Sequence, residues 1–342
     1  MAVKYAKDQP SGFKNHVSNI AIVGAGGRSG TFMVEALVSG GKHKVTAITR
    51  PDSKAALPSG LHGVKKVDYS SHQSLVDALQ GQDVLIITMA VFAPKDTQTK
   101  LIDAAVEAGV PFIMPNEWGG DRNTINNEQA GKDVFLGEGI RNIRAYIEKV
   151  GGDKTRWISL ACGFWYEFSL AGTEARYGFD FDKKEVTFYD DGNNRITTST
   201  WPQVGRAVAS LLSLNVLPKD ENDAQPFLGQ WTNGTVFVSS FRISQREMLA
   251  SVLRVTGDSE KDWTIKHEAV EERYKRGLGM MQKGEMVGFG ILLYARYFFD
   301  DVSKVATKKD DNGKLGLPEE SLDDATMVGV EMAKAGDTNV IL

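Results

Sequence analysis

The chain has a single cysteine, Cys162, among its 342 residues, so no disulfide can form within it. The lack of an internal disulfide framework is typical of a reducing compartment, and we therefore expect a cytoplasmic protein. No segment reaches the ~18 uninterrupted apolar residues of a membrane-spanning helix. The first residues are polar, unlike the apolar stretch of a secretory signal. The sequence therefore predicts neither export nor insertion into a membrane.

Clusters of basic residues and of metal ligands are also lacking. The net charge is −4 at pH 7, and no run of lysine and arginine offers the positive surface that binding of a nucleic-acid backbone requires. The five histidines are scattered, and the acidic pairs Asp190-Asp191 and Asp300-Asp301 stand in turn-like surroundings that favour solvation. Motifs such as H-E-x-x-H, G-x-S-x-G and G-x-x-x-x-G-K-[ST] are absent. We expect no nucleic-acid partner, no metal site and no hydrolase or triphosphatase chemistry.

An alternation of short apolar runs with longer helical stretches begins at Asn19. Apolar runs of this kind are typical of parallel strands that are buried on both faces and connected by helices. We therefore expect an α/β fold, with a Rossmann-type doubly wound parallel sheet in residues 19–162, after a flexible extension or surface strap in residues 1–18. The expected strands are 20–23, 45–49, 64–67, 84–88, 112–114 and 158–161, and the expected helices are 30–38, 71–79, 97–108 and 138–150.

The pattern changes after Gly163, where strand-like runs become shorter and less regular. We expect residues 163–342 to form mainly a smaller α+β substrate-binding lobe, with some return to the Rossmann core. The elements expected in this lobe are strands at 186–189 and 236–239 and helices that begin near Trp201, Ser244 and Glu268.

Three glycines follow the first expected strand directly, in the spacing G-x-x-G-x-x-G at Gly24, Gly27 and Gly30. Small residues there would permit a tight turn, a close approach of the backbone to a pyrophosphate and close packing of the next helix on the sheet. The amides of Arg28 and Ser29 would stand at the start of that helix, where anions bind. The spacing and its context predict a dinucleotide site; the alternative is a purely structural glycine-rich turn.

Positive charge follows the second expected strand, where an NAD-selective site would usually carry Asp or Glu. Arg50 and Lys54 stand there instead, and a guanidinium can hold a 2′-phosphate through paired hydrogen bonds. Arg28 could add a third positive group from the opposite side. We therefore predict NADP(H) rather than NAD(H); the alternative is that these are solvated loop cations.

Residues at the ends of the third and fourth expected strands are further candidates for cofactor contacts. Asp68 and Tyr69 could flank the adenine, while Met89, Ala90 and Val91 could line the crevice of the dinucleotide, because ligands of such sheets lie beyond the carboxyl ends of the strands. Ordinary packing at strand ends is the alternative for all five.

Taken together, these segments resemble the NmrA-like and isoflavone-reductase-like family, in its fungal type, which is an atypical branch of the short-chain dehydrogenases. The resemblance spans roughly residues 19–330. It rests on the glycine triplet, on Arg50, on the segment 98–110 and on Met-Pro-Asn-Glu-Trp-Gly at 114–119. It implies an NADP(H)-binding core, a smaller C-terminal substrate region and a small-molecule substrate.

The candidate catalytic residues come from this resemblance. The segment 114–119 is similar to the Pro-Ser-Glu-Phe-Gly stretch of the family, which lies beside the nicotinamide, and the likeness implies active-site roles for Asn116, Glu117 and Trp118. Tyr166 lies in a segment that takes the place of a family loop bridging cofactor and substrate. We therefore predict that these four side chains face the substrate.

The acid/base lysine of the family's reductases is missing. That lysine is followed three residues on by Ile-Arg, and the matching registers here put Ile140 or Gly137 at its position. Neither side chain can carry a proton. A Tyr with a Lys four residues later, the other route of the superfamily, is absent as well.

Three interpretations of the chemistry stay open. The first, which we take as the prediction, is an NADP(H)-dependent oxidoreductase in which Tyr166, Glu117 or a water supplies the proton. Its substrate would be an aromatic or polyunsaturated small molecule of secondary, for example alkaloid, metabolism. The others are a cyclase or isomerase without net redox change and an NADP(H)-sensing regulator that binds a protein partner. The aromatic-rich span 164–181 could form a pocket for a flat ligand or simply a packed core.

Overall fold

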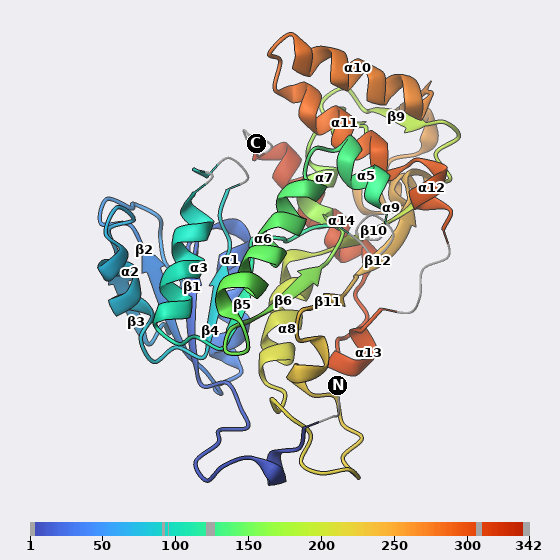
Figure 1. Ribbon diagram of the computed structural model, residues 1–342. Coiled ribbons are helices and arrows are strands. Elements are labelled where there is room, and N and C mark those ends of the chain that lie inside the picture. Colours follow the sequence, from blue (N-terminus) through green and yellow to red (C-terminus); the bar gives the residue numbers. More distant parts are fainter. Residues whose placement is uncertain (1–3, 91–92, 95, 121–126, 306–309, 338–342) are drawn as a thin grey trace.

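The computed structural model describes residues 4–90, 93–94, 96–120, 127–305 and 310–337. Two halves can be followed in Figure 1: a parallel sheet with helices on both faces at the left and below, and a lobe of helices and short strands at the upper right. Within the described residues, no helix is both long enough and apolar enough to cross a membrane.

A sheet of seven parallel strands forms the centre of the first half, called here the Rossmann half. Its strands are β1 (Asn19–Val23), β2 (Lys44–Thr49), β3 (Gly63–Lys66), β4 (Val84–Ile87), β5 (Phe112–Met114), β6 (Arg156–Ala161) and β11 (Gly234–Phe237). They lie in the order β11-β6-β5-β4-β1-β2-β3, and every neighbouring pair is parallel. The predicted doubly wound sheet is confirmed. The strand order reverses between β1 and β4, the place where such sheets bind ligands.

Helices cover both faces of this sheet because its central strands are apolar on both sides. Ile20 and Ile22 of β1 pack against one set of helices, and Ala21 and Val23 pack against the other. The first set is α1 (Arg28–Ser39) and α8 (Trp201–Leu212), and the second is α2 (His72–Leu79), α3 (Thr97–Glu107) and α6 (Gly137–Gly151). The sheet thus has a hydrophobic core on each face, between its strands and the helices that cover them.

Short strands and a larger number of helices form the lobe. Its two three-stranded sheets have the orders β12-β10-β7 and β13-β9-β8, from β7 (Phe164–Trp165), β8 (Phe179–Asp180), β9 (Glu185–Tyr189), β10 (Arg195–Ser199), β12 (Phe241–Ser244) and β13 (Thr264–Glu268). Its helices are α5 (Glu128–Asp133), α7 (Tyr166–Leu170), α9 (Gln245–Thr256), α10 (Val270–Gln282), α11 (Val287–Tyr297), α12 (Asp300–Ser303) and α14 (Leu322–Lys334). The remaining elements are α13 (Asn312–Leu315) and the 3-10 turns η1 (Ala6–Asp8), η2 (Leu228–Trp231) and η3 (Glu260–Asp262).

Several elements that follow residue 163 lie in the Rossmann half, among them β11 and α8. The run at 236–239 was expected as a strand of the lobe, but β11 pairs with β6 and extends the main sheet. A short apolar run has the same pattern in either place, so the sequence could not decide between them. Helix α8 lies against α1, where a Cβ on Gly205 would overlap the backbone oxygen of Phe32. Only glycine permits this approach of the two helices.

The N-terminal segment lies along the loop that follows α8. The Asn15 side chain donates a hydrogen bond to the Leu217 carbonyl oxygen (2.9 Å) and accepts one from the Leu217 amide (2.7 Å). Val17 is buried and belongs to the core of the Rossmann half. These contacts fix residues 15–17 against the first face of the sheet.

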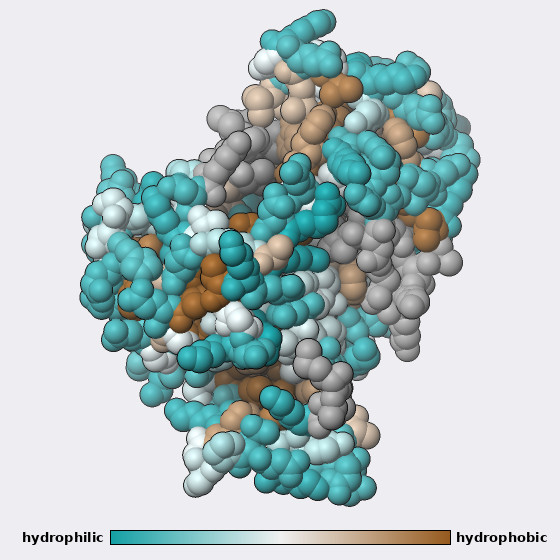
Figure 2. Space-filling model, viewed as in Figure 1, coloured by the Kyte–Doolittle hydropathy of each residue, from teal (hydrophilic) through white to brown (hydrophobic). Residues whose placement is uncertain are grey.

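The aromatic-rich span contributes chiefly to the core of the lobe. Tyr166, Tyr177 and Phe179 are fully buried, and the ring of Phe164 stacks on that of Tyr294 at 4.1 Å between centroids. Of the two interpretations of this span, the burial of these residues supports a packed core. The face shown in Figure 2 is mostly hydrophilic, with smaller hydrophobic patches that include one over α10 and α11.

Several segments that connect the two halves are hydrogen-bonded to the carboxylate of Glu320. It accepts hydrogen bonds from the Thr200 hydroxyl (2.9 Å), at the entry to α8, and from the Ser240 hydroxyl, on the way from β11 to β12. Arg206 of α8 donates a further bond to it. Because Glu320 lies in the segment that leads into α14, its side chain links three of the connecting segments.

A second acidic side chain, Glu167, is buried close by, at the junction of α7 and α8. Only 3% of the residue is exposed, and its Oε2 atom has no hydrogen-bond partner among the described residues. Burial raises the pKa of Glu167 from 4.5 to about 7, although the Trp201 amide favours the charged form. Nearby Glu320 raises it further. No local pattern in the sequence predicts that this carboxyl group is buried.

We expect Glu167→Gln to remove a pH dependence from the free energy of unfolding. The folded chain keeps the Glu167 proton up to about pH 7, whereas the ordinary pKa is 4.5. Between these values the folded state binds more protons, so its stability falls as the pH rises, by roughly 3 kcal/mol at most. Urea unfolding at about pH 5 and about pH 8 should therefore show a smaller loss in the variant than in the wild type.

Exposed Glu285 gives a matched control, because Glu285→Gln removes the same charge from the surface. That variant should follow the wild type at both pH values. Equal losses in wild type and Glu167→Gln would mean that Glu167 is already ionised in the folded chain.

Candidate functional site

The three glycines after β1 form a loop that is too tight for side chains. Gly24 has φ +85°, and a Cβ there would overlap the carbonyl oxygen of Thr88 at the end of β4. A Cβ on Gly30 would overlap the carbonyl oxygen of Gly24, to which the Gly27 amide donates a 2.9 Å hydrogen bond. The loop therefore holds the start of α1 directly against the ends of β1 and β4, as the spacing predicts.

The amino end of α1 has the form of an anion site. Gly27 is its N-cap residue, and no side chain caps the first amides, which include those of Arg28 and Ser29. Uncapped amides and the positive end of the helix dipole attract phosphate. A Cβ on Gly26 would lie 2.5 Å from the Ala56 carbonyl oxygen, so the loop after β2 comes close as well. These features fit the pyrophosphate of a dinucleotide.

Arg50 stands at the end of β2, exposed to solvent. Its Nε atom lies 3.6 Å from Oδ1 of Asp52, and 67% of its side chain is exposed, so the pair is weak. Burial raises the pKa of Tyr69, and the charge of nearby Arg50 opposes that rise. Lys54 is exposed in the same loop. Arg50 is thus available to an anionic ligand.

Asp68 is turned toward its own loop. Its Oδ1 atom accepts hydrogen bonds from the amide (2.8 Å) and the hydroxyl (2.7 Å) of Ser70, and these bonds lower the pKa of Asp68. The carboxylate therefore already has partners at the end of β3, where a cofactor contact is predicted.

Arg28 extends toward the lobe, away from Arg50. Its guanidinium carbon lies 5.9 Å from the ring centroid of Phe168 in α7 and 5.7 Å from that of Trp201 in α8. It also forms an ion pair with Asp337, beyond α14. Of the three predicted cations, Arg28 already has an anionic partner.

Asn116 and Trp118 fasten the end of β5 to the end of β4. The Asn116 side chain accepts a hydrogen bond from the Met89 amide (3.0 Å) and donates one to the Met89 carbonyl oxygen (3.1 Å). The Trp118 indole donates a bond to the Ile87 carbonyl oxygen (2.7 Å). These two predicted catalytic side chains therefore bind backbone atoms at the carboxyl end of β4. Ala90 is exposed there, and Val91 lies outside the described residues.

Glu117 forms a buried ion pair with Arg144 of α6. Its Oε2 atom accepts bonds from Nε (2.8 Å) and Nη2 (2.6 Å) of Arg144, and its side chain is only 3% exposed. Arg144 also donates to the Ser159 hydroxyl (3.2 Å) and lies 4.5 Å above the Trp157 ring centroid. Burial raises the pKa of Glu117, and Arg144 opposes the rise. The sequence did not predict Arg144 as a partner of Glu117. The Ile-Arg pair at 143–144 indicated only which position matches the lysine of the family.

Tyr166 lies apart from these three residues, inside the lobe. It is fully buried, and its hydroxyl lies 2.7 Å from the Thr326 hydroxyl of α14. Burial raises the pKa of Tyr166 well above its usual range. The structure therefore brings Asn116, Glu117 and Trp118 together beside β4 and β5, and it holds Tyr166 elsewhere.

Two positions were aligned by resemblance with the acid/base lysine of the family, and one of them has no room for a lysine side chain. Gly137, the first residue of α6, lies against Gly131 of α5, and a Cβ on Gly137 would be 2.9 Å from the Gly131 Cα. A lysine at 137 would force the two helices apart. Ile140, in the other register, is half-buried.

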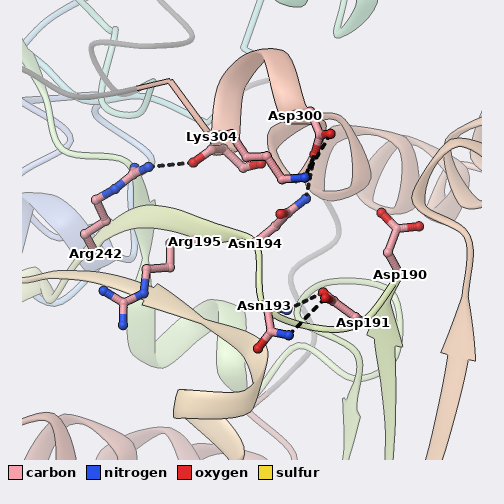
Figure 3. A pocket seen from close by; sticks show the side chains of 9 residues that line it. Asp190, Asp191, Asn193, Asn194, Arg195, Arg242, Asp300 and Lys304 are labelled. Carbon is pink, nitrogen blue, oxygen red and sulfur yellow. Dashed lines mark hydrogen bonds and ion pairs between the residues drawn. The ribbon is translucent and has the colours of Figure 1, made fainter.

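A surface cavity of about 600 Å³ lies in the lobe, away from the glycine loop (Figure 3). Its lining residues are Asp190, Asp191, Asn193, Asn194, Arg195, Arg242, Asp300, Ser303 and Lys304. The polar groups bind one another: Asp300 pairs with Lys304 (3.0 Å), and Asp191 accepts from Asn193 (2.9 Å). No cluster of three or more metal-ligating side chains occurs among the described residues. These contacts account for the acidic pairs as parts of the lobe's own structure.

Comparison with known proteins relates the chain to reductases. The NmrA-like family model matches residues 16–172. Oxidoreductase aprR of Aspergillus flavus is 27% identical, over 80% of this chain and 85% of the relative. Phenylcoumaran benzylic ether reductase Betv6 of Betula pendula is 30% identical, over 58% of this chain and 67% of the relative.

A solved structure supports the same relationship at the level of the fold. AtPrR2 with NADP⁺ and (+)pinoresinol matches with a TM-score of 0.68 at 18% identity, covering 93% of this chain and 100% of that one. At this identity the likeness concerns the fold alone. With the seven-stranded sheet, the glycine loop and the sequence matches in agreement, the chain belongs to the NmrA-like family.

Proposed function

We propose that this protein is an NADP(H)-dependent oxidoreductase that acts on an aromatic or polyunsaturated small molecule in secondary metabolism. The observation that carries the proposal is the glycine loop, where Gly24 and Gly30 leave no room for a Cβ and α1 begins with uncapped amides. Such a loop at the reversal point of a doubly wound sheet fits a dinucleotide. Arg50 at the end of β2 favours the form with a 2′-phosphate.

The relatives support the redox class. The two sequence relatives are named as an oxidoreductase and a benzylic ether reductase, and the related solved structure was determined with NADP⁺ and (+)pinoresinol. When bound, a nicotinamide supplies the hydride chemistry itself. The tasks left to this chain are to orient cofactor and substrate and to provide a proton.

The segment after β5 is suited to orientation. Asn116 and Trp118 hold it to β4 through three hydrogen bonds to backbone atoms, and Glu117 holds it to α6 through Arg144. We propose that Glu117 is a positioning residue, because its Oε2 atom binds the Arg144 guanidinium and its side chain is buried, while Oε1 has no hydrogen-bond partner among the described residues. The proton that balances hydride transfer would then come from water, since neither 137 nor 140 carries a lysine.

The proposed function is tested by calorimetry with NADPH, followed by the absorbance of NADPH during incubation with unsaturated aromatic and alkaloid metabolites. We expect micromolar or tighter binding and loss of absorbance with at least one metabolite, together with a reduced product. Binding without oxidation, but with an isomerised product, would contradict the redox assignment and support a cyclase. Absence of NADPH binding would contradict the cofactor.

We expect Arg50→Glu to weaken NADPH binding far more than NADH binding. The variant places a carboxylate where a 2′-phosphate is proposed, and loss of a charge-assisted contact plus repulsion costs about 2 kcal/mol or more, which is at least tenfold in Kd. NADH lacks that phosphate and should lose little. Calorimetric titration of both nucleotides measures the difference.

The matched control for Arg50→Glu is Lys261→Glu, a charge reversal at an exposed position in η3 of the lobe. It should leave both affinities unchanged. Equal weakening of NADPH and NADH by Arg50→Glu would exclude a role of Arg50 in the choice of nucleotide.

The contrast between Glu117→Gln and Tyr166→Phe distinguishes the roles of the two side chains. Glu117→Gln removes the negative charge that faces half-buried Arg144, and we expect a loss of roughly 2 kcal/mol in unfolding free energy with slower turnover. Tyr166→Phe removes one hydrogen bond to Thr326 and should cost about 1 kcal/mol with turnover preserved. Both variants should keep NADPH affinity. Loss of turnover in Tyr166→Phe at unchanged stability would instead identify the tyrosine as the proton donor.

A further inference from the structure

The residue after the end of α14 has a fixed position. Gly336 adopts φ +67°, its amide donates to the Ala333 carbonyl oxygen (3.0 Å), and the Asp337 amide donates to the Met332 carbonyl oxygen (3.0 Å). These two bonds and the left-handed glycine constitute a Schellman motif. The direction in which the chain leaves α14, and with it the location of the Asp337 side chain, follows from the helix end.

Helix α14 is itself fixed in the lobe. A Cβ on Gly329 would lie 3.0 Å from Leu170 of α7, so the two helices pack closely. Thr326 contacts the hydroxyls of Tyr166 (2.7 Å) and Ser251 (2.8 Å) inside the lobe. Asp337 is therefore carried by a rigid part of the lobe rather than by a free chain end.

The carboxylate of Asp337 meets the guanidinium of Arg28 at two points. Nη1 of Arg28 lies 3.1 Å from Oδ2, and Nη2 pairs with Oδ1. Arg28 is the first residue of α1, directly after Gly27 of the glycine loop. Its side chain is 37% exposed and that of Asp337 is 50% exposed. An ion pair so open to water contributes little stability and can exchange for another anion.

We propose that Asp337 competes with the dinucleotide phosphate for Arg28, so that the end of α14 restrains cofactor binding. This inference rests on the proposed function. The amino end of α1 is the proposed place of the pyrophosphate, and the guanidinium next to it already has two of its donors on a carboxylate. A phosphate that approaches α1 brings like charge toward Asp337, and Arg28 can present the same donors to only one of the two anions.

Binding of the cofactor therefore breaks the ion pair between Arg28 and Asp337. Each phosphate contact that Arg28 gains is offset by the loss of the Asp337 contact, which lowers the apparent affinity. The coupling is reciprocal, because the ion pair lowers the affinity of α1 for an anion by the same factor as the anion weakens the ion pair.

The test is the affinity for NADP⁺ of the full chain with Asp337→Asn, measured by calorimetry. We expect Kd to fall about twofold to fivefold at low ionic strength, the range of an exposed ion pair, and the gain to shrink with added salt. Glu331→Gln is the matched control, since Glu331 is exposed on the same helix. It removes the same charge and should leave Kd unchanged.

A second variant locates the effect at Arg28. Arg28→Gln should weaken NADP⁺ binding, and in that background Asp337→Asn should change Kd by less than its effect in the wild type, because the two act through one contact. An unchanged or raised Kd in Asp337→Asn alone, with the wild type binding NADP⁺, would overturn the competition. A wild type that does not bind NADP⁺ would overturn the proposed function and this inference with it.

Discussion

The tight approach of β1, β4 and α1 at Gly24 is the constraint on which the rest of the structure depends. Because a Cβ at Gly24 or Gly30 would overlap backbone atoms, the start of α1 can lie directly against the strand ends. That position determines where α8 lies, through the contact of Gly205 with Phe32. It also sets where Arg28 meets the lobe. One local turn thus orders both the proposed nucleotide site and the surface on which the second half is built.

Much of the Rossmann half could be predicted from the sequence because its signals are local. Buried parallel strands are apolar runs, and all six that were expected in residues 19–162 lie within two residues of their predicted bounds. Strands of two residues, such as Phe164–Trp165 and Phe179–Asp180, have no periodicity to detect. The run at 236–239 was recognisable as a strand, but its partner β6 is set by tertiary packing that no local pattern records.

The candidate site was predictable in position more than in role. Glycine spacing located the loop, and likeness to a family stretch located Asn116, Glu117 and Trp118. Their bonds to Met89, Ile87 and Arg144 depend on contacts between residues 27 or more positions apart, and sequence reasoning had no means of finding them. Glu167 and Asp337 were missed for the same reason, since a buried carboxyl group and a helix-end geometry are properties of the folded chain.

The hydrogen bonds that link the connecting segments to Glu320 have a mechanical consequence. A rotation of the lobe about any one connection would strain the others, because Thr200, Ser240 and Arg206 all bind the same carboxylate. Any movement of the lobe against the Rossmann half therefore requires that these bonds break together. Because the chain crosses between the two halves several times, the lobe is not one contiguous piece of sequence that could be exchanged for that of a relative.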